Sequence, residues 1–296
     1  MKNEEDQTSS VSGMLRKIGI SCCGFYAFIH RKPSKQKIRK EEIPKRIEEI
    51  HEESHQIYGA PKITVELRKE GYNVSEKYVG NIMREKGFKA HYIKPYTITA
   101  RDCNFSSRLK NILNREFNPG QPNSAWCTDI TYVWTNDEGF VYLTSVMDLY
   151  SKKIISWKLS KTMEVKEVLE CVKEAKSRRK SENSIIINSD RGVQFISKTY
   201  YDLTAGMIVS YSKKGNLWDN ASCIESFHSL IKREWLNRQK IQNWNHAYRL
   251  IFEYIEGFYN TVRIHSRCDY LSLNEYEQKC ELNNYILPFK LSKILT

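Results

Sequence analysis

Three acidic side chains occupy positions where a carboxylate needs a specific role. Asp129 interrupts the apolar and hydroxyl-bearing stretch AWCTDITYVW, where a buried charge is costly unless it is paired or bound to metal. Asp190 follows the isoleucine run 185–187, at the strand end where open α/β sheets bind ligands. Glu225 lies in NASCIESFHSLIKREW, off the apolar stripe that this segment forms at helical spacing. Carboxylates suit Mg²⁺, and two divalent ions about 3.5–4 Å apart catalyse phosphodiester cleavage and transfer.

Spacing alone leaves a plainer interpretation open for the same residues. Asp190 can cap the turn in SDRG, Asp129 can pair with a nearby arginine, and Glu225 can be solvated. Lys213 and Lys232 are candidates for holding DNA phosphates near the acids, although surface lysines are usually only solvated.

The elements that must position the acids follow from hydrophobic periodicity. Residues 125–134 alternate, which predicts a strand with Trp126 and Ile130 in the core and not in the site. Two more strands are predicted at 140–150 and 153–159, then a helix at 164–176 and a strand at 184–188. A helix near 197–205, a strand near 208–210 and helices at about 221–236 and 244–259 follow. This order predicts an α/β mixed sheet, three antiparallel strands then two parallel, with helices on both faces.

The preceding segment, residues 42–86, predicts three short helices. The first runs from about 44 to 56, with Pro44 in its first turn. The second begins at Pro61 and stops at Gly71, and the third follows the N-cap Ser75. Two helices joined by a short turn make a helix-turn-helix, and a small helical bundle without a ligand is the alternative.

The charge balance favours a polyanionic partner. The 296 residues include 47 Lys and Arg against 35 Asp and Glu, a net charge of +12, and residues 1–118 carry +8 of it (23 against 15). Basic and aromatic side chains alternate in residues 86–115, which suits a phosphate backbone and its bases; a solvated linker is the alternative. The basic residues chosen as DNA contacts there are Lys86, Lys89, Lys94 and Arg101.

Cysteine usage and the N-terminus bear on the compartment. The eight cysteines form no CxxC pair, so zinc ribbons and redox dithiols lack their signature. The start, MKNEEDQTSSVSG, is polar and acidic, unlike a signal peptide, and no apolar run approaches the roughly 18 residues of a membrane span. We therefore expect a soluble, intracellular protein.

Five ordered motifs resemble those of OrfB-type insertion-sequence transposases, which have a retroviral-integrase-like DDE core. They are WCTDITYVW, VMDLYSKKIISW, NSDRGVQF, SKKGNLWDNASCIESFHSLIKRE and FYNTVRIHSRCDYLSLNEYE, and residues 54–90 resemble the family's helix-turn-helix. The resemblance runs from about residue 14 to residue 277. It implies a ribonuclease H-like fold and a catalytic triad of Asp129, Asp190 and Glu225 that holds two Mg²⁺ or Mn²⁺ ions.

The resemblance also implies the reaction and its partners. A metal-bound water is expected to cleave the phosphodiester at the element end, and the freed 3′-OH then attacks another phosphodiester. The implied DNA partners are the element's terminal repeats and a target DNA. The protein is expected to act as a homo-oligomer on DNA, with an upstream-frame protein as a further candidate partner. Two departures bear on activity: Asn188 stands where the family reads His, and 34 residues separate Asp190 from Glu225 where the family has 35.

A rival motif is present at residues 51–55. HEESH matches H-E-x-x-H, the helix signature of zinc proteases, and Glu76 is at a tolerable distance for a third ligand. The helix is charged and lacks an apolar body, so a solvated helix face is the better interpretation of His51 and His55.

These observations predict six segments and one principal function. The segments are a disordered tail (1–13), a helical segment (14–36), a helix-turn-helix region (37–90), a basic linker (91–118), the DDE core (119–282) and a C-terminal tail (283–296). The function is DNA transposition. The alternatives are a catalytically decayed DNA-binding relic, a two-metal nuclease without strand transfer and, remotely, the zinc protease.

Overall fold

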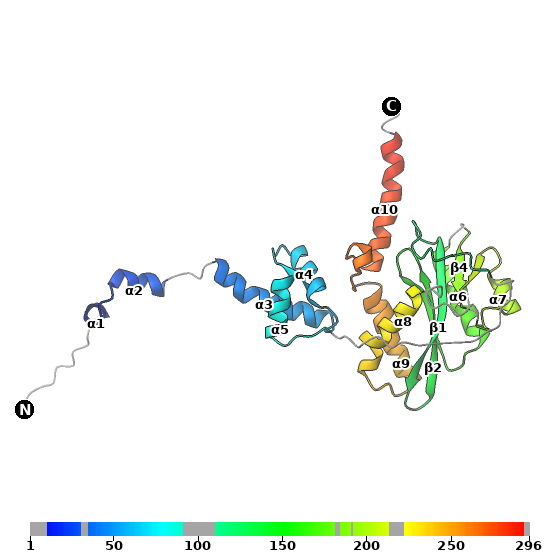
Figure 1. Ribbon diagram of the computed structural model, residues 1–296, viewed down its shortest axis with the longest axis horizontal. Helices are drawn as coiled ribbons and strands as arrows, with labels where there is room; N and C mark the ends of the chain where they lie inside the picture. The colour runs from blue at the N-terminus through cyan, green and yellow to red at the C-terminus, as the bar shows by residue number, and fades with distance from the viewer. Residues whose placement is uncertain are drawn as a thin grey trace, which may run out of the picture.

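The computed structural model describes residues 11–30, 35–90, 110–180, 184–190, 192–212 and 222–292. Two short helices, α1 (Val11–Lys17) and α2 (Cys22–Ile29), come first, so helix begins within the predicted tail. Helices α3 (Lys35–Glu53), α4 (Ala60–Lys69) and α5 (Glu76–Glu85) form the helix-turn-helix region (Figure 1). Within the described residues, no helix is long and apolar enough to cross a membrane.

A five-stranded sheet forms the centre of the C-terminal part. Its strands are β1 (Ala125–Thr135), β2 (Gly139–Asp148), β3 (Ile154–Ser160), β4 (Ile186–Ser189) and β5 (Ile208–Tyr211), in the order β3-β2-β1-β4-β5. The first three strands pair antiparallel, and β4 and β5 add in parallel. The predicted mixed sheet is confirmed, and its topology is that of the ribonuclease H-like fold.

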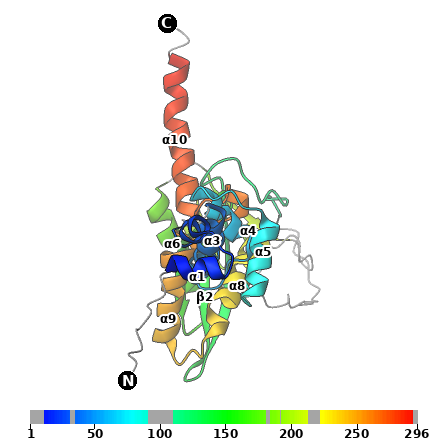
Figure 2. The same ribbon diagram turned by 90° about the vertical axis from the view of Figure 1, so that its left-hand side faces the viewer.

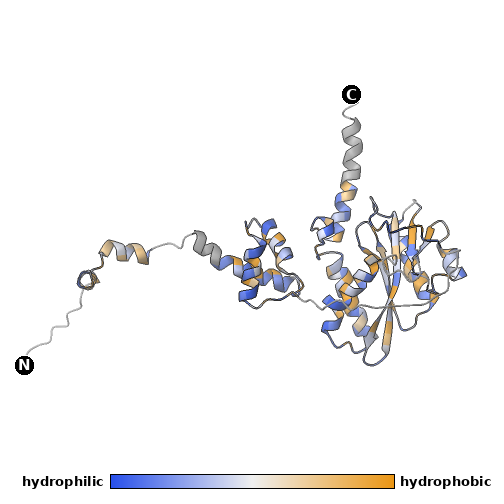
Figure 3. Ribbon diagram, viewed as in Figure 1, coloured by the Kyte–Doolittle hydropathy of each residue, from blue (hydrophilic) through white to orange (hydrophobic). Residues whose placement is uncertain are grey.

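Helices cover both faces of this sheet, as alternation within the strands requires (Figure 1). On one face, α6 (Val165–Arg179) and α7 (Lys198–Leu203) pack with Trp126 and Ile187 in one hydrophobic cluster. On the other, α8 (Ser222–Glu234) and α9 (Trp244–Phe252) pack with Cys127 and Val133. Much of the hydrophobic colouring in Figure 3 falls on the strands between these layers. Trp126 is fully buried and Ile130 packs against the core, as predicted.

The helix-turn-helix region differs from its prediction at the start. Helix α3 begins at Lys35 rather than near residue 44, and Pro44 lies inside it. The charged run before Pro44 consists mostly of good helix formers, so the helix extends through it although the proline removes one backbone hydrogen bond. Ser75 caps α5 by accepting from the Tyr78 N–H, as predicted.

The turn after α3 docks this region onto the catalytic part of the chain. The Tyr58 hydroxyl accepts a hydrogen bond from the Ile264 N–H at 2.9 Å, and both residues are buried. The His55 ring contacts Trp235 and Phe258 edge-on, at centroid distances of 4.8 and 5.6 Å. The buried apolar residues of α3–α5 and of the α8–α9 layer form one continuous cluster.

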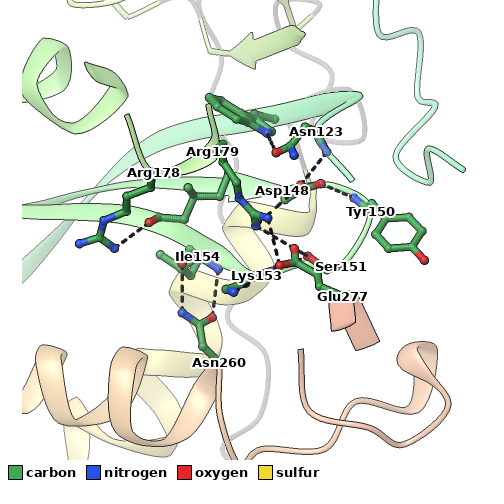
Figure 4. A network of polar contacts seen from close by, with 12 residues as sticks. Asn123, Asp148, Tyr150, Ser151, Lys153, Ile154, Arg178, Arg179, Asn260 and Glu277 are labelled. Carbon is green, nitrogen blue, oxygen red and sulfur yellow. Dashed lines mark hydrogen bonds and ion pairs between the residues drawn. The ribbon is translucent and has the colours of Figure 1, made fainter. Parts of the chain in front are cut away.

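The chain ends in a long helix, α10 (Leu273–Ser292), which extends from the body of the molecule in both ribbon views (Figures 1 and 2). It continues through much of the segment predicted as a C-terminal tail. Its first turns are held by a polar network (Figure 4). Arg179, at the end of α6, binds Glu277 of α10 at 2.7 Å, and Glu277 also accepts from the Ser151 hydroxyl at 2.6 Å. The fully buried Asp148, at the end of β2, lies 3.9 Å from the same arginine.

Candidate active site

Asp129 lies where β1 leaves its neighbour β4. The two strands pair from Ala125 to Cys127, and beyond Cys127 the described residues give β1 no partner on that edge. The Asp129 side chain is 17% exposed. Its Oδ1 accepts the Ile130 N–H at 2.8 Å, and its Oδ2 lies 3.4 Å from Nδ1 of His228 on α8. One carboxylate oxygen therefore accepts a backbone hydrogen bond, and the other faces a histidine and not an arginine.

Asp190 follows β4 in matching register. Cys127 of β1 is paired with Asn188 of β4, so Asp129, within β1, and Asp190, one residue past the end of β4, each stand two residues beyond this pair. Burial raises the pKa of Asp190, and the negative charge of Asp129 raises this pKa further. A hydrogen bond from the Gly192 N–H, at 2.9 Å, lowers it. The structure thus brings two partly buried carboxylates within electrostatic reach of each other, while Asp190 also accepts the Gly192 N–H.

Glu225 lies in the first turn of α8, in the helical layer and not in the sheet that carries the two aspartates. Ile224 and Phe227, each 1% exposed, fix the helix on the core, and Glu225 is half-buried on a neighbouring face. Among the described residues, no three His, Cys, Asp or Glu side chains come together as a ready metal-binding group. The structure therefore assembles the aspartate pair and places Glu225 on the helix that covers it, without closing the three into one cluster.

His228 was not predicted as part of the site. It lies one helical turn after Glu225, is 5% exposed, and its Nε2 is 2.7 Å from the Ser145 hydroxyl of β2. Register pairs Ser145 directly with Asp129 across the β1–β2 ladder. The signal available in the sequence was the i, i+3 spacing from Glu225, which puts both side chains on one side of α8.

Among the predicted DNA-binding cations that the structure describes, Lys232 interacts with Asp129. Its Nζ sits 4.6 Å from the centre of the exposed Tyr132 ring. Burial lowers the pKa of Lys232, and the charge of Asp129 opposes that shift. Lys86 forms an ion pair with Glu48 at 2.7 Å, while Lys89 is exposed. Lys94, Arg101 and Lys213 lie outside the described residues.

Asn188 is the buried polar side chain that departs from the resemblance. It is fully buried, and neither its side-chain oxygen nor its nitrogen has a hydrogen-bond partner. Such groups cost about 1–3 kcal/mol each when left unsatisfied. The buried end of β4, two residues before Asp190, is therefore polar and incompletely hydrogen-bonded.

The zinc-protease interpretation of residues 51–55 is wrong, and the solvated helix face is wrong for His51, which is buried, while His55 is exposed but lies beyond the end of the helix. Helix α3 ends at Glu53, and His55 follows it in a left-handed conformation (φ 54°), so the two histidines do not share a helix face. His51 is 6% exposed, with Nδ1 3.3 Å from the Tyr58 carbonyl and its ring stacked on Phe88. The reason is tertiary: His51 packs against Tyr58 and Phe88 within the helix-turn-helix region, and His55 contacts Trp235 and Phe258 while staying exposed.

Comparison with known proteins fits this architecture. The family model for the integrase core domain matches residues 119–229, and a second model of that description matches residues 205–272. An HTH-like domain matches residues 38–96. The transposase for insertion sequence element IS904 of Lactococcus lactis is 34% identical over 260 residues, 84% of this chain and 99% of that protein. The chain belongs to the insertion-sequence transposase family.

Two further similarities bear on this transposase. The transposase InsF for insertion sequence IS3A of Escherichia coli is 32% identical over 279 residues, 91% of this chain and 94% of its own. Among solved structures, the HTLV-2 integrase catalytic core domain in complex with magnesium is 16% identical, with a TM-score of 0.41, over 53% of this chain and 98% of that one. That likeness is low, and the strand order and the family match are the stronger grounds for the fold.

Proposed function

We propose that this transposase moves an insertion sequence by metal-dependent cleavage and strand transfer at the element ends. The observation that carries the proposal is the aspartate pair: Asp129 within β1 and Asp190 just past β4 each stand two residues beyond the paired Cys127 and Asn188, within an integrase core. Burial, and in smaller part the negative charge of Asp129, raises the pKa of Asp190, and a bound divalent cation would favour the charged form of both carboxylates.

The donor set fits hard divalent cations. Asp129 and Asp190 offer carboxylate oxygens, and Glu225 stands on the covering helix as the third donor. We assign the three as the ligands of Mg²⁺ or Mn²⁺, with two ions during catalysis. When bound, the ions activate the attacking oxygen and stabilise the leaving oxygen of an in-line phosphodiester displacement.

The chain's own groups prepare this chemistry. The Ile130 N–H fixes one Asp129 oxygen, and the Gly192 N–H fixes one Asp190 oxygen. These bonds orient the carboxylates before DNA arrives, so less ordering remains to be done in the transition state. We assign Lys232, near Asp129, to hold phosphates beside the scissile bond, and we assign Lys213 the same role from the sequence alone.

The exposed face of α5 is the second part of the proposal. Val79, Ile82 and Met83 are buried, which leaves Lys77, Asn81 and Arg84 exposed on the second helix of the motif. The Arg84 guanidinium donates to the Asn81 side chain at 3.1 Å, so the two already form one polar surface. Arginine and asparagine read guanine and adenine edges in the major groove, and we assign this face to the terminal repeats.

The partners follow from the reaction. The substrates are the element's terminal repeats and a target duplex, and two ends are joined most simply by a homo-oligomer on DNA. An upstream-frame protein is a further candidate partner. We place the activity at the bacterial nucleoid, where the element resides.

A strand-transfer assay tests the function. A labelled duplex of the element's end, incubated with a target duplex and Mg²⁺ or Mn²⁺, should yield joined product with the wild type and none with Asp190→Asn. Cleavage without joining, even from a supplied 3′-OH end, would assign a two-metal nuclease instead.

The inactive relic remains the second candidate, and Asn188 is the observation that favours it, since its amide is buried without partners. Asn188→His should then restore metal-dependent joining to an inactive wild type. Binding of the element's end by both proteins, with neither cutting it, would support the relic.

A further inference from the structure

We propose that His228 is a positioning residue that fixes the metal-binding geometry of Asp129, with Ser145 anchoring its ring. This inference rests on the proposed function, because it takes Asp129 to be a metal ligand. His228 does not touch DNA or metal in this assignment; it acts through the aspartate.

The geometry joins three elements at one imidazole. Nδ1 of His228, from α8, lies 3.4 Å from Oδ2 of Asp129 on β1, and Nε2 lies 2.7 Å from the Ser145 hydroxyl on β2. The first distance is slightly longer than a hydrogen bond of 2.7–3.2 Å and is within reach of one after a small side-chain movement. The second is already a hydrogen bond, so the ring is held at its far nitrogen.

Burial leaves the ring little freedom to turn away. The His228 side chain is 6% exposed, Ser145 is fully buried, and the ring lies 5.6 Å from that of Phe227. Ser145 is the cross-strand partner of Asp129, so anchor and aspartate are fixed relative to each other by the β1–β2 ladder. Any shift of α8 that moves Glu225 also moves His228 against Asp129.

The arrangement fits a role in metal binding better than a role in packing alone. The Ile130 N–H holds Oδ1 of Asp129, and the imidazole faces Oδ2, so both oxygens have a set direction. Groups that orient a metal ligand typically contribute 10–100-fold to metal affinity or activity. A histidine that only filled space in the core would not need the Ser145 hydroxyl at one ring nitrogen and the Asp129 carboxylate near the other.

The test measures Mn²⁺ binding to the full-length protein by electron paramagnetic resonance, without DNA, together with thermal melting without metal. His228→Leu should weaken Mn²⁺ binding by about 10–100-fold. His228→Gln keeps an N–H donor and should recover most of the affinity. Ser145→Ala removes only the anchor and should give a smaller loss. Ser229→Ala, at the next, exposed position of α8, should bind Mn²⁺ like the wild type.

The outcomes separate this inference from the proposed function. Unchanged Mn²⁺ affinity in His228→Leu, with only a lower melting temperature, would overturn the positioning role. If His228→Leu fails to fold, equal affinities in His228→Gln, Ser145→Ala and the wild type would overturn it as well. A loss of Mn²⁺ affinity in a protein that joins no DNA would uphold the positioning role while the transposition proposal fails.

Discussion

At the scale of single residues, backbone N–H groups hold the carboxylates of Asp129 and Asp190. Gly192 is the most sensitive position, because its N–H holds Asp190 and a Cβ placed there would meet Asp190 Oδ1 and Gln194 Oε1 at 3.0 Å each. We predict that Gly192→Ala lowers the strand-transfer rate at least tenfold by displacing the Asp190 carboxylate, with little change in melting temperature. Gly120→Ala, where a Cβ would meet nothing within 4 Å, should be active. Equal rates for both variants would contradict this picture.

A second residue-scale prediction concerns Asp148 and pH. Its burial raises its pKa to about 6, against hydrogen bonds from the Asn123 and Tyr150 N–H groups. The folded state therefore binds this proton more tightly than the unfolded state. The stabilisation that the protonated Asp148 carboxyl gives the folded state is complete below about pH 4 and is lost as the pH rises through 6. The unfolding free energy of the wild type minus that of Asp148→Asn should fall over this range, by at most about 3 kcal/mol.

Urea denaturation at several pH values measures this difference. The exposed Asp137→Asn is the matched control and should give a difference that stays flat across the same range. A flat difference for Asp148→Asn too would show that its carboxyl titrates normally in the folded protein.

At the scale of elements, α8 is joined to the end of the α9 layer by a buried ion pair. Arg263 binds Glu234 at 2.7 Å, the two side chains are 9% and 5% exposed, and the Tyr254 hydroxyl donates to the same carboxylate. Arg263→Met leaves a buried carboxylate unpaired, and we predict a loss of about 3–5 kcal/mol in unfolding free energy. Arg249→Met breaks the exposed Arg249–Glu253 pair and should cost less than about 1 kcal/mol. Similar losses for the two variants in denaturant titrations would contradict this role.

How far the sequence predicts these elements depends on the range of the interactions. Alternation in AWCTDITYVW and the isoleucine run of β4 are local, and they predicted the sheet and both aspartates' places on it. The predicted start of α3 is wrong because it treats Pro44 as a helix boundary. A long helix tolerates the loss of the one backbone hydrogen bond that a proline removes. His55 and His228 could not be placed from the sequence, since each is fixed by partners distant in the chain, Trp235 for one and Ser145 for the other.

At the scale of the whole molecule, the docked turn fixes the helix-turn-helix region relative to the catalytic part. We predict that Tyr58→Phe leaves the buried Ile264 N–H unsatisfied and costs about 1–3 kcal/mol. Hydrogen exchange at the Ile264 amide should accelerate, while protection in β1 and β2 is retained. Tyr248→Phe, at a side chain 42% exposed, should leave the Ile264 exchange rate unchanged. Unaltered exchange at Ile264 in Tyr58→Phe would show that the turn does not hold the two parts together.

The central claim is that Asp129, Asp190 and Glu225 serve one metal site, and iron-directed backbone cleavage tests it most directly. Fe²⁺ bound in place of Mg²⁺, with ascorbate and peroxide and the element's end present, cuts the chain beside its ligands. We predict cuts near residues 129, 190 and 225 together, competed away by Mg²⁺ and lost in Asp190→Asn. Cuts near 129 and 190 but never near 225, or cuts elsewhere in the chain, would contradict the three-carboxylate site.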